Sequence, residues 1–113
     1  MKTILVTGAG FLTKHLLKRL LKTKNKIRVY SRSQRGLEGV ERLYGRKERL
    51  TLIQGDILNK DKLMMSMGGV DEVIHTAAEK RIDWCERFVD EATRINIIGT
   101  DHVCYCAHMS GVK

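Results

Sequence analysis

The sequence predicts an α/β protein in which a doubly wound parallel sheet is covered by helices on both faces. Along the 113 residues, short apolar and β-branched segments alternate with segments whose apolar residues recur at helical spacing. Strands that alternate with helices in this way are joined by right-handed crossovers and therefore run parallel. The length leaves room for one hydrophobic core, so we expect a single domain over residues 1–113.

The elements follow in order along the chain. Residues 2–8 are apolar and β-branched, which predicts a buried strand, and the leucines of residues 12–21 then recur at helical spacing. Further strands are expected over 26–32, 49–56 and 70–78, and further helices over 36–45, 59–69 and about 87–109. In a Rossmann-like sheet a fifth strand would come after residue 113, so we expect a sheet truncated after about four β-α units.

Two of these helices predict particular core residues. The helix over 59–69 is expected to bury its methionines, Met64, Met65 and Met67. The last helix is expected to bury Val89, Ala92, Ile95 and Val103.

The cysteines indicate no metal site and no disulfide framework. Cys85, Cys104 and Cys106 are odd in number and form no Cys-x-x-Cys pair, the spacing that many structural zinc sites use. Cys104 and Cys106 lie two residues apart in a predicted helix and so face different sides of it. We therefore expect buried free thiols and no bound metal.

Composition and charge bear on location and partners. No apolar run approaches the ~18 residues of a membrane span, and no signal peptide is recognisable, so we expect a cytoplasmic protein without a membrane partner. Residues 1–50 hold 14 Lys and Arg against 3 Asp and Glu, whereas residues 51–113 hold 7 against 10. A basic half suits a cofactor phosphate, a nucleotide substrate or a nucleic acid, of which we favour the nucleic acid least. A solvated helix face explains many of these lysines equally well.

The turn after the first strand carries the clearest functional signal. Gly8, Gly10 and Thr13 occupy the three positions of a G-x-G-x-x-G turn between a strand and a helix, the context in which this pattern binds a dinucleotide. Gly8 permits the tight turn, and Gly10 lets the backbone approach a pyrophosphate that faces the helix amides near Phe11 and Leu12. Thr13 replaces the third glycine, so either the helix lies further out or the hydroxyl replaces a contact. A glycine turn that binds nothing is the alternative.

The end of the second strand bears on which cofactor is bound. In dinucleotide folds an acid about 20 residues beyond the turn holds the ribose 2′-hydroxyl of NAD. No acid occurs at this distance, and the first to follow is Glu38. Arg32 and Arg35 suit the 2′-phosphate of NADP instead, and Ser31 and Ser33 add hydroxyl donors. The pattern favours NADP and makes NAD the weaker candidate, unless these arginines are simply solvated.

Four short segments make the chain resemble a known group. They are VYSR at 29–32, GDI at 55–57, HTAAEK at 75–80 and NIIGT at 96–100. With the glycine turn they resemble the extended short-chain dehydrogenase/reductase superfamily. Within it the chain is similar to UDP-N-acetylglucosamine 4,6-dehydratases of the polysaccharide-biosynthesis type. The resemblance covers essentially all 113 residues and implies an NADP cofactor and a nucleotide-sugar substrate.

The resemblance also implies roles for individual residues. The residues it implies around the cofactor are Gly8, Ala9, Gly10, Phe11, Leu12, Thr13, Ser31, Arg32, Ser33, Arg35, Asp56, Ile57, Thr76 and Ala77. Within this set, Asp56 and Ile57 are expected beside the adenine. Lys80 resembles the lysine with which the family contacts its substrate.

Two departures from the family pattern limit what the resemblance implies. The turn TGAGFLT at 7–13 is one residue shorter than usual. The superfamily's Tyr-x-x-x-Lys pair is also missing, because no tyrosine is followed by a lysine four residues later. We therefore predict no catalytic residue here and interpret the chain as the cofactor-binding part of a dehydratase or epimerase, either as a gene fragment or as part of a split enzyme.

Other functions stay open on the sequence. One alternative is a non-catalytic module that senses a dinucleotide and regulates a partner protein, and another is a basic nucleic-acid-binding protein. A sheet that ends at its fourth strand also leaves an apolar edge uncovered, so we expect self-association.

Overall fold

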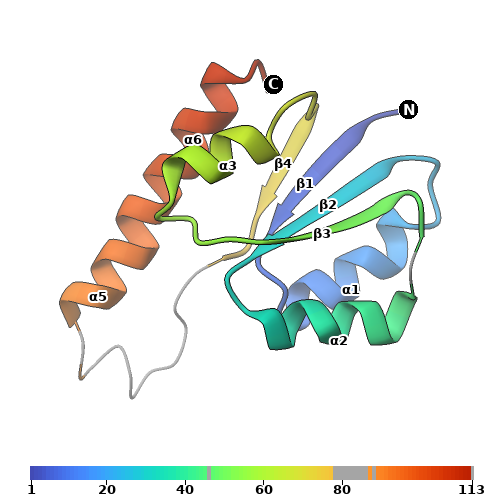
Figure 1. Ribbon diagram of the computed structural model, residues 1–113, viewed down its shortest axis with the longest axis horizontal. Coiled ribbons are helices and arrows are strands. Elements are labelled where there is room, and N and C mark those ends of the chain that lie inside the picture. The colour runs from blue at the N-terminus through green and yellow to red at the C-terminus, as the bar shows by residue number, and fades with distance from the viewer. Residues whose placement is uncertain (46, 78–86, 88, 113) are drawn as a thin grey trace.

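The protein is described by a computed structural model that covers residues 1–45, 47–77, 87 and 89–112. Within these residues one parallel sheet is formed by β1 (Thr3–Thr7), β2 (Lys26–Ser31), β3 (Leu50–Gln54) and β4 (Glu72–His75). The strand order is β3-β2-β1-β4, as Figure 1 shows. The chain thus moves outward from β1 to β3 and then crosses to the other side of β1, which confirms the predicted fold class.

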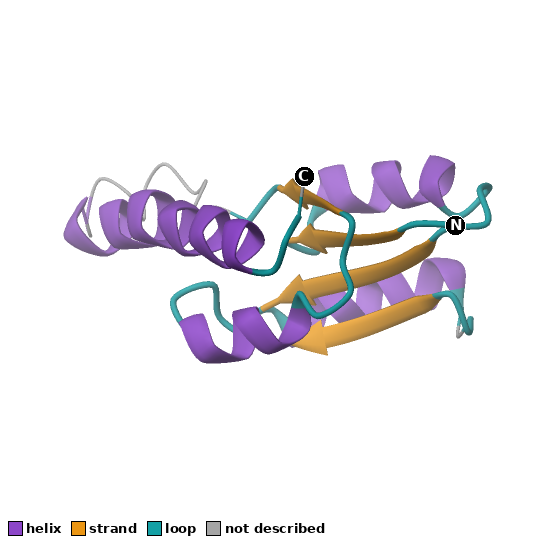
Figure 2. Cartoon of the chain, turned by 90° about the horizontal axis from the view of Figure 1, so that it is seen from above, coloured by secondary structure: helices purple, strands orange, loops and turns teal. Residues whose placement is uncertain are grey.

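Helices cover both faces of this sheet. On one face lie α1 (Phe11–Leu20) and α2 (Gln34–Tyr44). On the other lie α3 (Lys60–Ser66) and a long helix made of α5 (Val89–Thr93), the π-helical η1 (Arg94–Ile98) and α6 (Gly99–Met109). Figure 2 shows the strands between these two layers. The connection from β3 to β4 through α3 therefore lies on the opposite face of the sheet from the connections through α1 and α2.

The alternation of side chains along the strands builds two separate cores. Ile27 and Val29 of β2 are fully buried in the cluster that includes Leu17 of α1 and Val40 of α2. Tyr30, one residue further along β2, points to the opposite face and belongs to the cluster under α3 and α6. Because both faces of the sheet are covered, the central strands read as continuous apolar runs in the sequence.

Two predicted core positions are wrong. Met67 is fully buried, but Met65 is 83% exposed, because a residue two positions before an inward-facing helical residue points away from the core. Val89 is 60% exposed at the start of the long helix. Ala92, Ile95 and Val103 are buried as predicted.

The cysteines divide between the two sides of α6, as the sequence predicts. Cys106 is buried and its thiol donates to the backbone oxygen of Lys60, whereas Cys104 is exposed. The expectation that Cys104 is a buried thiol is therefore wrong, and Cys85 lies outside the described residues. Burial raises the pKa of the Cys106 thiol, which keeps it protonated at neutral pH.

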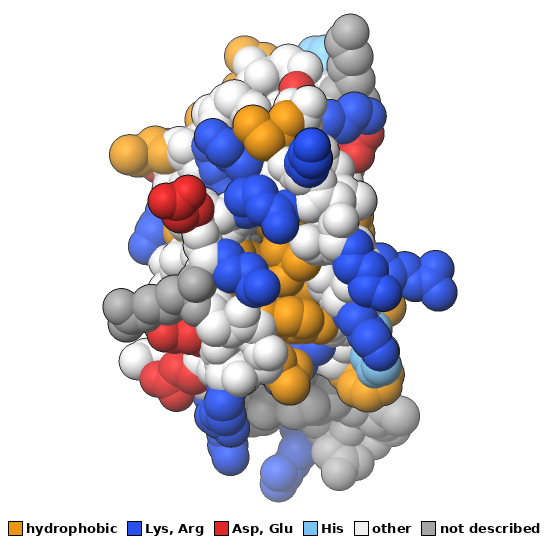
Figure 3. Space-filling model, turned by 90° about the vertical axis from the view of Figure 1, so that its right-hand side faces the viewer, with side chains coloured by type: hydrophobic (Ala, Val, Ile, Leu, Met, Phe, Trp, Pro, Cys, Tyr) orange, Lys and Arg blue, Asp and Glu red, His pale blue; other side chains and the backbone are white. Residues whose placement is uncertain are grey.

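Lysine and arginine side chains of the first half of the chain lie mostly on the surface. Figure 3 shows a face on which many lysine and arginine side chains lie around a strip of hydrophobic residues. The exposed ones are Lys2, Lys18, Arg19, Lys22, Lys24, Lys26, Arg32, Arg35, Arg42 and Lys47. No helix in the described ranges is both long and apolar enough to cross a membrane.

Candidate functional site

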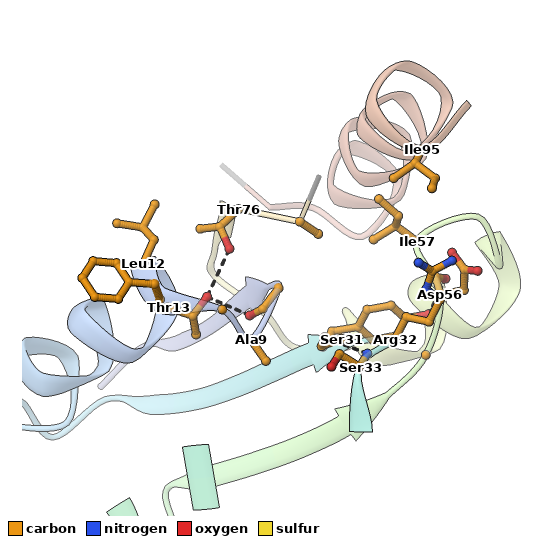
Figure 4. Close-up of a pocket in the computed structure, with 16 residues that line it drawn as sticks. Ala9, Leu12, Thr13, Ser31, Arg32, Ser33, Asp56, Ile57, Thr76 and Ile95 are labelled. Carbon is orange, nitrogen blue, oxygen red and sulfur yellow. Dashed lines mark hydrogen bonds between the residues drawn. The ribbon is translucent and has the colours of Figure 1, made fainter. Parts of the chain in front are cut away.

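A pocket of about 530 Å³ opens at the carboxyl ends of the strands. It lies where the chain order reverses between β1 and β4, the place at which open α/β sheets bind ligands. Figure 4 shows its walls, which come from the turns after β1, β2, β3 and β4 and from the long helix. The lining residues are Gly8, Ala9, Gly10, Phe11, Leu12, Thr13, Tyr30, Ser31, Arg32, Ser33, Gly55, Asp56, Ile57, Thr76, Ala77 and Ile95.

The turn after β1 requires glycine at its first position. Gly8 has a φ of 92°, a conformation that side chains disfavour, and its N–H donates to the Tyr30 carbonyl oxygen across 2.8 Å. A Cβ added to Gly8 would lie 2.5 Å from Thr76 Oγ1. The predicted role of Gly8 in a tight turn follows directly from this geometry.

Gly10 and the start of α1 form a surface suited to an anion. Gly10 is the N-cap of α1, where it supplies no side chain, and the first turn of the helix contains no acidic residue. A Cβ on Gly10 would meet no atom within 4 Å, so the space in front of it is open to the pocket. The first amides of a helix lack intrahelical acceptors and carry its positive end, and here they meet the pocket at Phe11 and Leu12.

Thr13 stands at the place of the third glycine, between the glycine turn and the end of β4. Its side chain is fully buried, and its hydroxyl donates to the carbonyl oxygen of Gly8 across 2.7 Å. Thr13 Oγ1 also lies 3.1 Å from Thr76 Oγ1, just after β4, and the dashed lines in Figure 4 mark both contacts. Of the two expectations for this position, the hydroxyl that replaces a contact is the one observed.

The turn between β2 and α2 places an arginine and two serines at the pocket. Ser33 is the N-cap of α2 and its Oγ accepts from the N–H of Gly36, while Ser31 Oγ accepts from the N–H of Ser33. Neither role uses the hydroxyl proton, so each serine still has a donor to offer. Arg32 lines the pocket, whereas Arg35 lies exposed in the first turn of α2 and is not among the lining residues.

Tyr30 and Gly55 are pocket residues that sequence reasoning missed. The Tyr30 side chain is fully buried and its hydroxyl donates to the backbone oxygen of Asp56 across 2.8 Å. Burial raises its pKa to about 12, so the phenol stays protonated. A Cβ on Gly55 would lie 2.5 Å from the Tyr30 ring, so only glycine lets the chain after β3 pass over this ring.

The long helix reaches the pocket through a close contact with the turn after β3. Gly99 begins α6 directly against Ile57, and a Cβ there would lie 2.3 Å from Ile57 Cδ1. Ile95, one turn earlier in the π-helical segment η1, lines the pocket on the same side as Asp56 and Ile57 in Figure 4. Ile95 was predicted as a core residue and not as a pocket residue. A π-helical turn, which often occurs at functional sites, has no sequence signature that would have revealed it.

His75 joins the end of β4 to both β1 and α6. Its Nδ1 lies 2.6 Å from Thr7 Oγ1 and its Nε2 lies 2.9 Å from Thr100 Oγ1. Thr100 donates to the Asn96 carbonyl oxygen, so it accepts from Nε2–H, and Thr7 accepts from backbone N–H groups, so it donates to Nδ1. The neutral ring with its proton on Nε2 satisfies every partner, and burial lowers the pKa of His75 in agreement with this.

The structure gathers almost all of the predicted cofactor residues into this one pocket. Arg35 lies outside the pocket lining, and Lys80 lies outside the described residues. Among the described residues no cluster of three or more His, Cys, Asp or Glu side chains could hold a metal ion.

Comparison with known proteins identifies the family that this chain resembles. The sequence profile of the polysaccharide biosynthesis protein family matches residues 4–113. The UDP-glucose 4-epimerase of Rickettsia bellii is 31% identical over 117 residues, which cover 98% of this chain and 34% of that protein. An uncharacterized membrane protein of Methanocaldococcus jannaschii is 38% identical over 104 residues, which cover 90% of this chain and 31% of that protein.

Solved structures of related proteins have the same fold over nearly the whole of this chain. Pen from Bacillus thuringiensis superposes with a TM-score of 0.93 at 32% identity and covers 99% of this chain. DesIV, a dTDP-glucose 4,6-dehydratase from Streptomyces venezuelae with NAD bound, superposes with a TM-score of 0.83 at 28% identity and covers 97%. This chain spans 36% and 37% of those two chains, and about a third of the curated relatives. The chain belongs to the polysaccharide biosynthesis protein family, of the short-chain dehydrogenase/reductase type, and it is similar to about a third of the length of nucleotide-sugar epimerases and dehydratases.

Proposed function

We propose that this chain is the cofactor-binding part of a nucleotide-sugar epimerase or dehydratase and that it binds NADP in preference to NAD. One observation carries the proposal: a single pocket combines the open N-terminus of α1 with Arg32 and two serines at the end of β2. The first feature suits the pyrophosphate of a dinucleotide. The second suits a 2′-phosphate, since a guanidinium forms paired, charge-assisted hydrogen bonds with such a group.

The preference for NADP rests on what stands at the end of β2. A carboxylate there would accept from the ribose hydroxyls of NAD and repel a 2′-phosphate. Here the first turn of α2 contains no acidic residue, and its N-cap Ser33 lines the pocket beside Arg32. DesIV and the UDP-glucose 4-epimerase of Brucella ovis were solved with NAD, so the proposal predicts that this chain differs from them.

The substrate of the complete protein is proposed from the family. Members act on nucleotide sugars, and in such enzymes the cofactor takes a hydride from the sugar and returns it. Proton transfer in the superfamily needs the Tyr-x-x-x-Lys pair, and no such pair occurs in these 113 residues. We therefore propose that this chain binds the cofactor without turning over a nucleotide sugar by itself, with Lys80 as its residue toward the substrate.

A thermal-shift experiment tests the cofactor proposal. A ligand that binds only the folded state raises its stability by RT ln(1 + [L]/Kd), so at equal concentration NADPH should raise the melting temperature more than NADH does. Arg32→Ala should remove most of the NADPH advantage and leave the NADH shift nearly unchanged. Arg42→Ala is the matched control, because Arg42 is an exposed arginine in the last turn of α2, the helix that follows Arg32.

The outcomes separate the candidate functions. Equal shifts with both nucleotides, or a larger one with NADH, would refute the NADP preference but leave dinucleotide binding standing. No shift with either, together with salt-sensitive binding to a DNA or RNA duplex, would favour the basic face as a nucleic-acid surface instead. NADPH binding that is retained while a partner protein is captured would favour the sensing module.

A further inference from the structure

Thr13 occupies a position where two walls of the pocket meet. Its hydroxyl contacts the Gly8 carbonyl oxygen of the glycine turn on one side and Thr76 Oγ1 at the end of β4 on the other. Thr76 in turn donates to the carbonyl oxygen of Thr7, the last residue of β1. Thr13 and Thr76 therefore connect the end of β1, the glycine turn and the end of β4 through side-chain hydroxyls.

The number of protons makes these contacts one network. Thr13 and Thr76 each have one hydroxyl proton, yet three short contacts use them: one to Gly8, one to Thr7 and one between the two hydroxyls. Two protons thus serve three contacts among four oxygen atoms, so at most two of the contacts are hydrogen bonds at one time, and the direction of each hydroxyl depends on the other. Loss of either one alters what its partner can donate.

We propose that Thr13 is a positioning residue for pyrophosphate binding, an inference that rests on the proposed dinucleotide function. The Gly8 carbonyl and the Ala9 N–H belong to one trans peptide unit, so they point in opposite directions. A hydrogen bond that holds the carbonyl toward Thr13 therefore fixes the direction of the Ala9 N–H in the pocket wall. Thr13 thus replaces the packing function of a glycine with a hydroxyl that orients the turn.

A purely structural role for Thr13 makes a different prediction. If the hydroxyl only fills space and satisfies buried groups, its loss lowers the stability of the whole domain and weakens every ligand of the folded state alike. If it orients the turn, its loss weakens only ligands that carry a pyrophosphate. Adenosine 2′-monophosphate carries the 2′-phosphate but no pyrophosphate, so comparison with NADPH distinguishes the two roles.

The experiment measures the Kd of both ligands for four forms of the chain by isothermal titration calorimetry. Thr13→Val removes the hydroxyl at constant volume, Thr13→Ser keeps it, and Thr13→Gly restores the usual glycine in case the valine variant does not fold. We expect Thr13→Val or Thr13→Gly to weaken NADPH about tenfold and to leave adenosine 2′-monophosphate within about twofold. Thr13→Ser should bind both ligands within about twofold of the unaltered chain.

A double-mutant cycle with Thr76→Val completes the test. If the two hydroxyls act as one network, the combined effect on NADPH affinity falls well short of the sum of the single effects. Unchanged NADPH affinity in a folded, hydroxyl-free variant would overturn the proposal, and so would equal weakening of both ligands or additive effects in the cycle. Failure of the unaltered chain to bind either ligand would overturn the proposed cofactor binding itself, and this inference with it.

Discussion

The hydroxyl of Thr13 donates to the carbonyl oxygen of Gly8, five residues earlier in the chain, across 2.7 Å. This bond ties the first full turn of α1 to the end of β1. In a chain that lacks the third glycine of the motif, a side-chain hydroxyl thus connects the helix to the turn. The residue that most weakened the sequence-based case for a dinucleotide turn is therefore one that holds the turn together.

Gly8 should be the least replaceable glycine of the turn. Gly8→Ala forces a side chain into a φ of 92° and places its Cβ 2.5 Å from Thr76 Oγ1, so we expect a loss of about 2–4 kcal/mol in unfolding free energy. Gly69→Ala is the control, because Gly69 has a φ of 74° but open space around it. It should lose about 1–2 kcal/mol. Urea denaturation checks both values, and equal losses would show that the contact with Thr76 costs nothing.

Gly10 should separate binding from stability. Gly10→Ala meets no atom within 4 Å and keeps an extended backbone with a φ of −91°, so we expect a loss of stability of about 1 kcal/mol or less. The new methyl group occupies the space in which a pyrophosphate would approach, so NADPH affinity should fall at least about tenfold. Isothermal titration calorimetry with NADPH measures the affinity, and thermal unfolding without ligand measures the stability. Unchanged NADPH affinity would place the pyrophosphate elsewhere.

Much of this arrangement could be predicted from the sequence, and the failures have physical causes. Apolar runs bounded by turn residues predicted the four strands and their parallel direction, most clearly for the central strands β1 and β2, which are mostly buried. Helix α2 begins at Gln34 and not at residue 36, because Ser33 acts as its N-cap, a signal that the sequence did contain. The π-helical turn at Ile95 has no such signal. Tyr30 was missed because its inward direction depends on strand register, and its place in the pocket depends on Gly55.

His75 should make stability depend on pH in a defined direction. Its pKa is lowered in the folded state, so between that value and the ordinary 6.5 the unfolded chain binds more protons than the folded one. The contribution of the neutral ring is therefore complete above about pH 6.5 and is lost as the pH falls below it. We expect the unfolding free energy to fall between pH 7 and 5, with a shallower dependence in His75→Gln. Parallel curves for the two proteins would assign the dependence to other groups.

Self-association should follow from the exposed side of β4. In the described part of the chain, β4 pairs only with β1 and forms one border of the sheet, and its four residues are all partly accessible. An open apolar strand of this kind offers unpaired backbone groups to another chain. Sedimentation velocity at increasing concentration should therefore show a weight-average sedimentation coefficient that rises with concentration. A single monomeric species at every concentration would contradict this prediction.

Finally, the chain should bind its cofactor without producing a sugar product. Epimerisation and dehydration need a base on the sugar hydroxyl while the hydride leaves, and one general acid–base group contributes about 10²–10⁴ in rate. None of the three tyrosines is followed by a lysine four residues later, and Tyr30 is buried under Gly55 with its hydroxyl donating to the Asp56 carbonyl oxygen. The purified chain would be incubated with NADP and either UDP-glucose or UDP-N-acetylglucosamine, beside a full-length epimerase of the family as positive control. Mass spectrometry and sugar analysis should show 4-keto or epimerised product only in the control, and product that scales with this chain alone would refute the prediction.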